Sequence, residues 1–133
     1  MREFVVYDTN TFVSYLLSSK KTSAVCIAVA SIFDETAVPV FSDETMAEYV
    51  RVLNYEKFDF LPEQINDLLD FVRSNGLYVV PHPTTVPFVD ISDKPFYDAA
   101  VSSGAWLVTG NVRHFPVEGF IVSPREYLER VGR

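Results

Sequence analysis

The sequence predicts a protein of the α/β class, in which helices alternate with the strands of a mostly parallel sheet. The first observation is that short apolar runs recur along the 133 residues, with segments of helical apolar spacing between them. This alternation implies βαβ crossovers between parallel strands. The second is an apolar fraction of 48%, which is enough for a sizeable core in one domain spanning residues 1–133. The third is that Cys26 is the single cysteine, which excludes a fold stapled by internal disulfides.

Each strand is predicted from a short apolar run that is bounded by polar or turn-forming residues. The first run ends directly at Asp8, and a fully apolar run of this length is typical of a central strand that is covered on both faces. The expected strands are, in order, residues 4–7, 37–41, 77–80, 106–108 and 120–122.

The helices are predicted from apolar residues three and four positions apart, and their ends from capping residues. Ser42, Pro62 and Ser123 are suitable helix starts, and Gly76 is a suitable stop. The stretch 81–91 contains three prolines and two threonines and is expected to be an extended loop. The expected helices cover residues 11–17 and 22–33 (capped by Thr22 or Ser23), the segment from Ser42 to Leu53, the segment from Pro62 to Gly76, residues 95–103, and the chain after Ser123.

The charge and hydropathy of the chain limit the classes of function. There are 18 acidic and 11 basic residues, so the net charge of −7 argues against loose, charge-driven binding of nucleic acids. It does not exclude an enzyme that meets phosphates through bound cations. The apolar runs at 4–7 and 25–33 are too short for a signal sequence or a membrane span, so we expect no membrane association. Together with the single cysteine, this favours a cytoplasmic location.

Acidic and amide side chains follow the predicted strands, where an open parallel sheet binds its ligands. Asp8 follows the first strand, Glu48 lies in the helix after the second, Asp93 precedes the helix at Pro95, and Asn111 follows the fourth strand. Clustered carboxylates raise one another's pKa, so such a cluster is stable at neutral pH mainly with a cation. Oxygen ligands suit Mg²⁺ or Mn²⁺, which could ionise an attacking water and stabilise the leaving oxygen of a phosphodiester.

Taken one at a time, these residues also have structural explanations. Asp8 and Asp93 could be helix caps, Glu48 a solvated helix residue, and Asn111 a turn residue beside Gly110. Asp98 would be a surface partner of Lys94. His82, His114 and Cys26 have no partner at metal-ligand spacing and are interpreted as loop and core residues.

Four segments of the sequence resemble the PIN-domain family, the fold of the VapC-like toxin nucleases. The first segment contains the Asp-Thr-Asn sequence, the second a serine followed by a helical glutamate, and the third an Asp-initiated helix, an apolar strand and Thr-x-Asn. The fourth is similar to the last strand and helix of a PIN branch described as toxins of toxin–antitoxin pairs. In order, the segments are VVYDTNTFVS (5–14), FSDETMAEYVRVL (41–53), DKPFYDAAVSSGAWLVTGNVRHFP (93–116) and FIVSPREYL (120–128).

The resemblance implies a three-layer α/β/α sandwich and a metal-dependent endoribonuclease. By position, Asp8, Glu48 and Asp93 match the family's ligands for Mg²⁺ or Mn²⁺. Asn111 falls where many relatives carry a fourth aspartate, and the neutral amide would favour one-metal chemistry. It also implies RNA as substrate, an antitoxin protein as a partner and a homodimer.

Six further residues are candidates for supporting roles. Asn10 and Thr109 could hydrogen-bond the carboxylates, and Ser42 could do so unless it is used as a helix cap. Arg113 could contact a substrate phosphate or simply be a surface arginine. Asp98 could replace the missing fourth acid, although on an ideal helix it points roughly 140° away from Asp93. Asn111 is the sixth candidate for a supporting role.

Two other functions remain open at this point. One is a catalytically degenerate PIN module that binds RNA or a protein partner without cleavage, which the Asn111 position and the acidic surface favour. The other is a phosphatase or DNA nuclease that uses similar carboxylates.

Overall fold

The centre of the structure is a five-stranded sheet in which all neighbouring strands are parallel. The structure is a computed structural model, and it describes residues 2–133. The strand order β3-β2-β1-β4-β5 reverses between β1 and β4, because the chain builds outward from β1 on one side and then crosses over to the other. The strands are β1 (Glu3–Tyr7), β2 (Ala37–Phe41), β3 (Leu77–Tyr78), β4 (Trp106–Val108) and β5 (Ile121–Val122).

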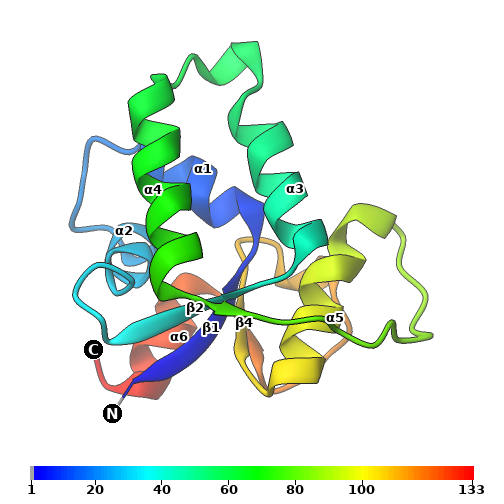
Figure 1. Cartoon of the computed structure of the whole chain (residues 1–133). Helices are drawn as coiled ribbons and strands as arrows, with labels where there is room; N and C mark the ends of the chain where they lie inside the picture. The colour runs from blue at the N-terminus through cyan, green and yellow to red at the C-terminus, as the bar shows by residue number, and fades with distance from the viewer. Residues whose placement is uncertain (1) are drawn as a thin grey trace.

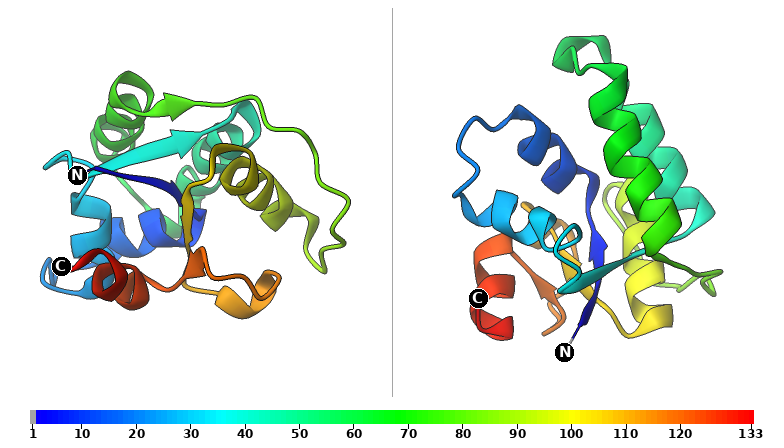
Figure 2. Two further views of the ribbon diagram at one scale, coloured as in Figure 1. Left: turned by 90° about the horizontal axis from the view of Figure 1, so that it is seen from below. Right: turned by 60° about the vertical axis from the view of Figure 1, so that its left-hand side comes forward.

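Helices cover both faces of this sheet, which confirms the predicted three-layer α/β/α architecture (Figure 1). On one face α5 lies against β1, β2 and β4, with α3 beside it. On the other face α1, α2 and α6 pack together (Figure 2). The helices are α1 (Thr9–Leu17), α2 (Ala24–Ala30), α3 (Asp43–Leu53), α4 (Pro62–Asn75), α5 (Lys94–Ser103) and α6 (Pro124–Val131), with short 3-10 turns η1 (Glu56–Phe58), η2 (Ile91–Asp93) and η3 (Val112–His114).

Burial explains why the central strands are uniformly apolar. Val5 and Val6 of β1 and Leu107 and Val108 of β4 are fully buried, since helices cover both sides of each strand. The register places Tyr7 opposite Val108, so β1 and β4 end at the same level. Ligands of open α/β sheets bind where the strand order reverses, and that position lies just beyond these two residues.

Gly76 ends α4, as predicted, because the chain leaves no space there for a side chain. A Cβ at this position would lie 2.4 Å from the Val72 carbonyl oxygen and 2.5 Å from that of Pro39. The glycine therefore allows α4 to end directly against β2.

Two elements are shorter than predicted by two or more residues, and the neighbouring chain explains both. The helix expected over 22–33 ends at Ala30, and the Asp34 carboxylate accepts hydrogen bonds from the backbone and hydroxyl of Thr36, which forms a turn before β2. The strand expected over 77–80 ends at Tyr78, because its neighbour β2 stops at Phe41 and the chain there turns into α3.

No helix within residues 2–133 has both the length and the apolar character that a bilayer crossing requires.

Candidate functional site

A buried tyrosine on α3 ties together the three elements that carry the candidate acids. The Tyr49 hydroxyl donates a hydrogen bond to the carbonyl of Tyr7, the last residue of β1. Its ring centroid lies 4.7 Å from that of Phe12 on α1 and 5.7 Å from that of Phe96 on α5. Tyr49 is 1% exposed, so its position fixes α3 against the end of β1 and the start of α5.

The contacts of Tyr49 also position the acidic residues, because each acid is close in sequence to an element that these contacts hold. Asp8 follows Tyr7, Glu48 precedes Tyr49, and Asp93 lies at the start of α5. Burial is the main cause of the raised pKa of both Asp8 and Asp93, and the negative charge of Glu48 adds a smaller contribution to each.

Asp8 is held by hydrogen bonds from the residue that follows β4 and from α1 instead of serving as a helix cap. It occupies the N-cap position of α1, yet its side chain makes no capping hydrogen bond. Its Oδ2 accepts from the Thr109 hydroxyl at 2.8 Å and from the Asn10 amide at 3.3 Å. The Thr109 oxygen in turn accepts from the Asn111 backbone at 2.9 Å. Burial raises the pKa of Asp8, and the Thr109 hydrogen bond partly offsets this.

Asp93 has a buried oxygen without a hydrogen-bond partner. It too occupies an N-cap position, that of α5, without capping it. Its Oδ2 is buried and accepts no hydrogen bond within residues 2–133, and the nearest basic atom, His114 Nδ1, is 3.7 Å away. Burial, followed by the charges of Asp8 and Asp90, raises the pKa of Asp93 to about 6. Asp8 and Asp93 thus form a repelling pair of the kind that a cation would relieve.

Glu48 is engaged by an arginine on its own helix. Both of its oxygens accept hydrogen bonds from Arg51 Nη2, at 2.7 and 2.8 Å, and Oε1 also accepts from Nε at 3.1 Å. No three His, Cys, Asp or Glu side chains in the described part of the chain are arranged to hold a metal ion. The convergence of Asp8, Glu48 and Asp93 on one ion stays a prediction, and in this structure the guanidinium of Arg51 occupies both oxygens of Glu48.

Two of the auxiliary candidates are used for other purposes. Ser42 is fully buried and caps α3, accepting from the Thr45 backbone at 3.2 Å while its own backbone donates to the Thr45 hydroxyl at 2.9 Å. Asp98 accepts from Lys94 at 2.8 Å and from the Thr84 hydroxyl at 2.6 Å. The hydroxyl of Ser42 and the carboxylate of Asp98 are therefore engaged away from Asp8 and Asp93.

The segment after β4 forms an open side of the site. Asn111 and Arg113 are exposed, and the side chain of Arg113 makes no hydrogen bond or ion pair with any residue in the range 2–133. A hollow of about 420 Å³ is lined by residues 110–114. His114, which we interpreted from the sequence as an ordinary loop histidine, lies on this hollow and next to Asp93. The sequence signal for a place of His114 near the site is its position three residues after the candidate Asn111.

The fold and the site together define a parallel α/β protein with two mutually repelling aspartates, Asp8 buried and Asp93 largely buried, where the strand order reverses. A family model described as the PIN domain matches residues 4–113. The chain therefore belongs to the PIN-domain family, whose members are typically nucleases and generally use divalent metals. Comparisons with curated proteins and with solved structures gave no match.

Proposed function

We propose that this protein is a Mg²⁺- or Mn²⁺-dependent endoribonuclease and the toxin of a toxin–antitoxin pair. The observation that carries the proposal is the pair Asp8 and Asp93. Asp8 is buried, burial and the charge of Asp8 raise the pKa of Asp93, and the buried Oδ2 of Asp93 has no hydrogen-bond partner within residues 2–133. A protein that gains nothing from such a pair would be more stable with neutral side chains there.

The residues fit a hard divalent cation. Asp8 and Asp93 supply oxygen donors only, which suits Mg²⁺ or Mn²⁺ better than zinc. The unpartnered Oδ2 of Asp93 provides a free ligand position, and Glu48 provides another when it leaves Arg51. When bound, such a cation lowers the pKa of water and stabilises the oxygen that leaves the phosphorus.

The other polar residues orient the site and receive the substrate. Thr109 and Asn10 hold the Asp8 carboxylate, as outer partners of metal ligands do. In this proposal Arg113, which is exposed on the hollow lined by residues 110–114, contacts a backbone phosphate of the RNA. His114 can hydrogen-bond the same phosphate or Asp93.

The proposed activity is tested by incubating the wild-type protein and Asp8→Asn with a panel of RNAs, a single-stranded DNA and a phosphate monoester. We expect cleavage of RNA by the wild type with Mg²⁺ or Mn²⁺, and none with a chelator or with Asp8→Asn. Equal cleavage by both proteins would contradict the proposal, since a contaminating nuclease would then explain it. Turnover of DNA or of the monoester alone would indicate a different phosphodiesterase or a phosphatase.

A degenerate PIN module that binds RNA or protein without cleavage is the second candidate. It is favoured by the engagement of Glu48 with Arg51 and by the neutral Asn111 in place of an acid. Calorimetric titration with Mn²⁺ separates the two functions, because a degenerate site would show no saturable binding.

The toxin role predicts an antitoxin that covers the site, a cytoplasmic location and, from the family resemblance, a homodimer. Induced expression should arrest growth of a bacterial host with the wild type but not with Asp8→Asn. Unimpaired growth with an active ribonuclease would remove the toxin role and leave the nuclease proposal intact.

A further inference from the structure

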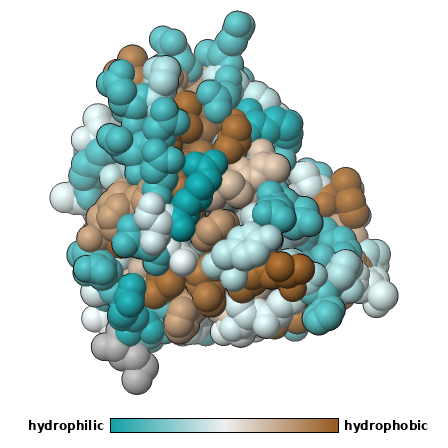
Figure 3. Space-filling model, in the orientation of Figure 1, coloured by the Kyte–Doolittle hydropathy of each residue, from teal (hydrophilic) through white to brown (hydrophobic). Residues whose placement is uncertain are grey.

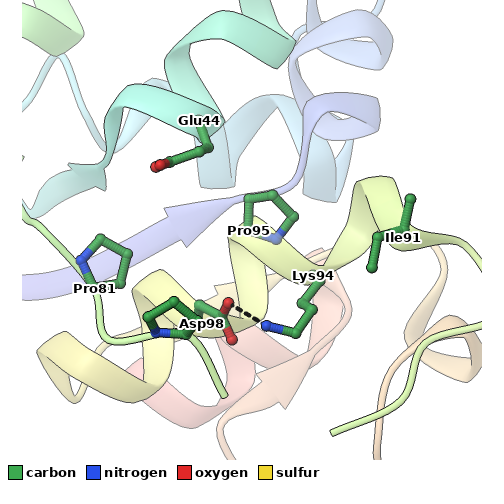
Figure 4. Close-up of a pocket in the computed structure, with 7 residues that line it drawn as sticks. Glu44, Pro81, Ile91, Lys94, Pro95 and Asp98 are labelled. Atoms are coloured by element: carbon green, nitrogen blue, oxygen red, sulfur yellow. Dashed lines mark hydrogen bonds and ion pairs between the residues drawn. The ribbon is translucent and has the colours of Figure 1, made fainter. Parts of the chain in front are cut away.

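A pocket of about 230 Å³ opens between the first turn of α3, the start of α5 and the loop that follows β3 (Figure 4). Its size is below the ~300 Å³ typical for drug-sized ligands and suits a single flat ring system. Its wall is mainly apolar, and its polar side chains are few. The residues that form it include Pro81, Ile91, Pro95, Glu44, Lys94 and Asp98.

The pocket adjoins the candidate acids. Glu44 lies one helical turn before Glu48 on α3, and Lys94 directly follows Asp93. A strand of RNA whose phosphate lies at Asp8 and Asp93 would therefore bring a neighbouring base to this pocket. Figure 3 shows hydrophobic patches, interleaved with hydrophilic ones, on the side of the molecule where α5 and the preceding loop lie.

The polar groups of the pocket present one acceptor and one donor to a ligand. Both oxygens of Asp98 already have partners, because Oδ1 accepts from the backbone and hydroxyl of Thr84 and Oδ2 accepts from Lys94, a bond that is drawn in Figure 4. Lys94 keeps two ammonium hydrogens free, since Asp98 is its one hydrogen-bond partner within residues 2–133. The Glu44 carboxylate is exposed, and within the same residues it accepts no hydrogen bond.

We propose that this pocket binds a guanine base of the RNA substrate, which rests on the ribonuclease function proposed above. Guanine presents two adjacent donors, N1–H and the N2 amino group, which match the two oxygens of Glu44. On the corresponding edge, adenine and cytosine each present one donor next to one acceptor. The acceptor would face an oxygen of the Glu44 carboxylate, which is unfavourable because both atoms carry lone pairs. Lys94 donates to guanine O6 or N7, and the proline rings and Ile91 cover the faces of the base.

The first test measures binding of 5′-GMP, 5′-IMP and 5′-AMP by calorimetry in the presence of a chelator. We expect GMP to bind about tenfold more tightly than AMP, because a bidentate contact gives discrimination of that order. IMP, which lacks the N2 amino group, should lie between them. Equal affinities for GMP and AMP would overturn the proposal.

Two variants and a control assign any preference to the pocket. Glu44→Gln should bring the GMP-to-AMP ratio close to one, whereas Glu63→Gln, an exposed first-turn glutamate of α4, should leave it unchanged. Ile91→Ala removes apolar wall from an exposed side chain and should weaken all three nucleotides without changing their ratio. A Glu44→Gln protein that keeps the preference would overturn the assignment.

Short RNAs distinguish a base in the RNA strand from a free nucleotide. Oligouridines with one central guanosine should bind more tightly than the same RNAs with adenosine. Preference for free GMP but not for the guanosine-containing RNA would overturn the assignment to the substrate. Binding is measured without metal, so its result is independent of cleavage. If the protein cleaves RNA but shows no guanine preference, this inference fails and the proposed function stands. If it prefers guanine but cleaves no RNA, the proposed function fails and the guanine pocket stands.

Discussion

Asp93, directly before α5, and Asp98, within α5, show how differently one fold treats two largely buried carboxylates. The side chains of Asp93 and Asp98 are similarly buried, 14% and 9% exposed. Asp98 has a partner on each oxygen, Thr84 on Oδ1 and Lys94 on Oδ2. Asp93 has a buried oxygen with no hydrogen bond and stands against the charge of Asp8. Burial alone therefore does not mark a functional carboxylate, whereas a missing partner does.

The difference is also one of stability. A buried ion pair is costly to break, because removing one partner leaves an uncompensated charge. A buried carboxylate that lacks a partner is already in that condition, so its ionised form lowers the stability of the fold unless a cation arrives. We interpret Asp98 as part of the framework and Asp93 as part of the site.

The largest expected effect concerns catalysis. Asp93→Asn should lower metal-dependent RNA cleavage by more than about a hundredfold. Mutation of residues that only contact a metal ligand costs up to about a hundredfold, and a ligand itself should cost more. The physical reason is the loss of a carboxylate whose buried Oδ2 is free to bind the cation. Initial rates with Mn²⁺ measure it, and circular dichroism checks the fold. A variant with near wild-type rates would place the metal site elsewhere.

The two aspartates should respond to neutralisation with opposite signs of stability. Asp98→Asn leaves the Lys94 ammonium, 19% exposed, without its partner and should lower the free energy of unfolding by about 3 kcal/mol. Asp93→Asn relieves repulsion and should raise it by about 1 kcal/mol at pH 7, allowing for partial solvation. Urea unfolding in metal-free buffer measures both. Destabilisation of similar size in both variants would remove the distinction drawn here.

The pH dependence of stability sharpens the same comparison. The pKa of Asp93 is raised from 3.8 to about 6 in the folded protein, so the folded state binds more protons than the unfolded state between these values. The contribution of Asp93 to stability therefore falls as pH rises from about 4 to about 6 and levels off above that range. The stability difference between Asp93→Asn and wild type should grow over this interval, and urea unfolding at several pH values would show it. A difference that is constant with pH would contradict the cause given for the shift.

The smallest effect is expected from releasing Glu48. Arg51→Met should tighten Mn²⁺ binding about two- to fivefold, because an exposed ion pair of this kind is weak and competes only modestly with the cation for Glu48. Arg73→Met, which breaks the analogous Arg73–Asp70 pair on α4, is the matched control and should change nothing. Calorimetry would measure both. Equal effects would show that the change comes from net charge and not from Glu48.

Most of the architecture follows from local patterns in the sequence. The apolar runs that became β1, β2 and β4 were predictable because strands covered on both faces contain few polar residues. The starts of α3, α4 and α6 were predictable from Ser42, Pro62 and Ser123. The lengths of α2 and β3 were not, since they depend on the Asp34–Thr36 turn and on where the neighbouring strand β2 ends.

The positions of the candidate site residues along the fold were predictable from the sequence, but the side chains that they contact were not. The placement of Asp8, Asp93 and Asn111 after strands or before a helix follows from the spacing of the elements. That Arg51 engages Glu48 and that His114 approaches Asp93 depends on side-chain directions after packing, which the spacing of residues does not determine.

The claim that Asp8 and Asp93 together bind a divalent cation is tested most directly by a crystal soaked in Mn²⁺. We predict an anomalous peak about 2.1 Å from an oxygen of each aspartate, as octahedral coordination of a small divalent ion requires. A saturating soak that leaves this position without a peak, or that places Mn²⁺ away from both side chains, would contradict the account.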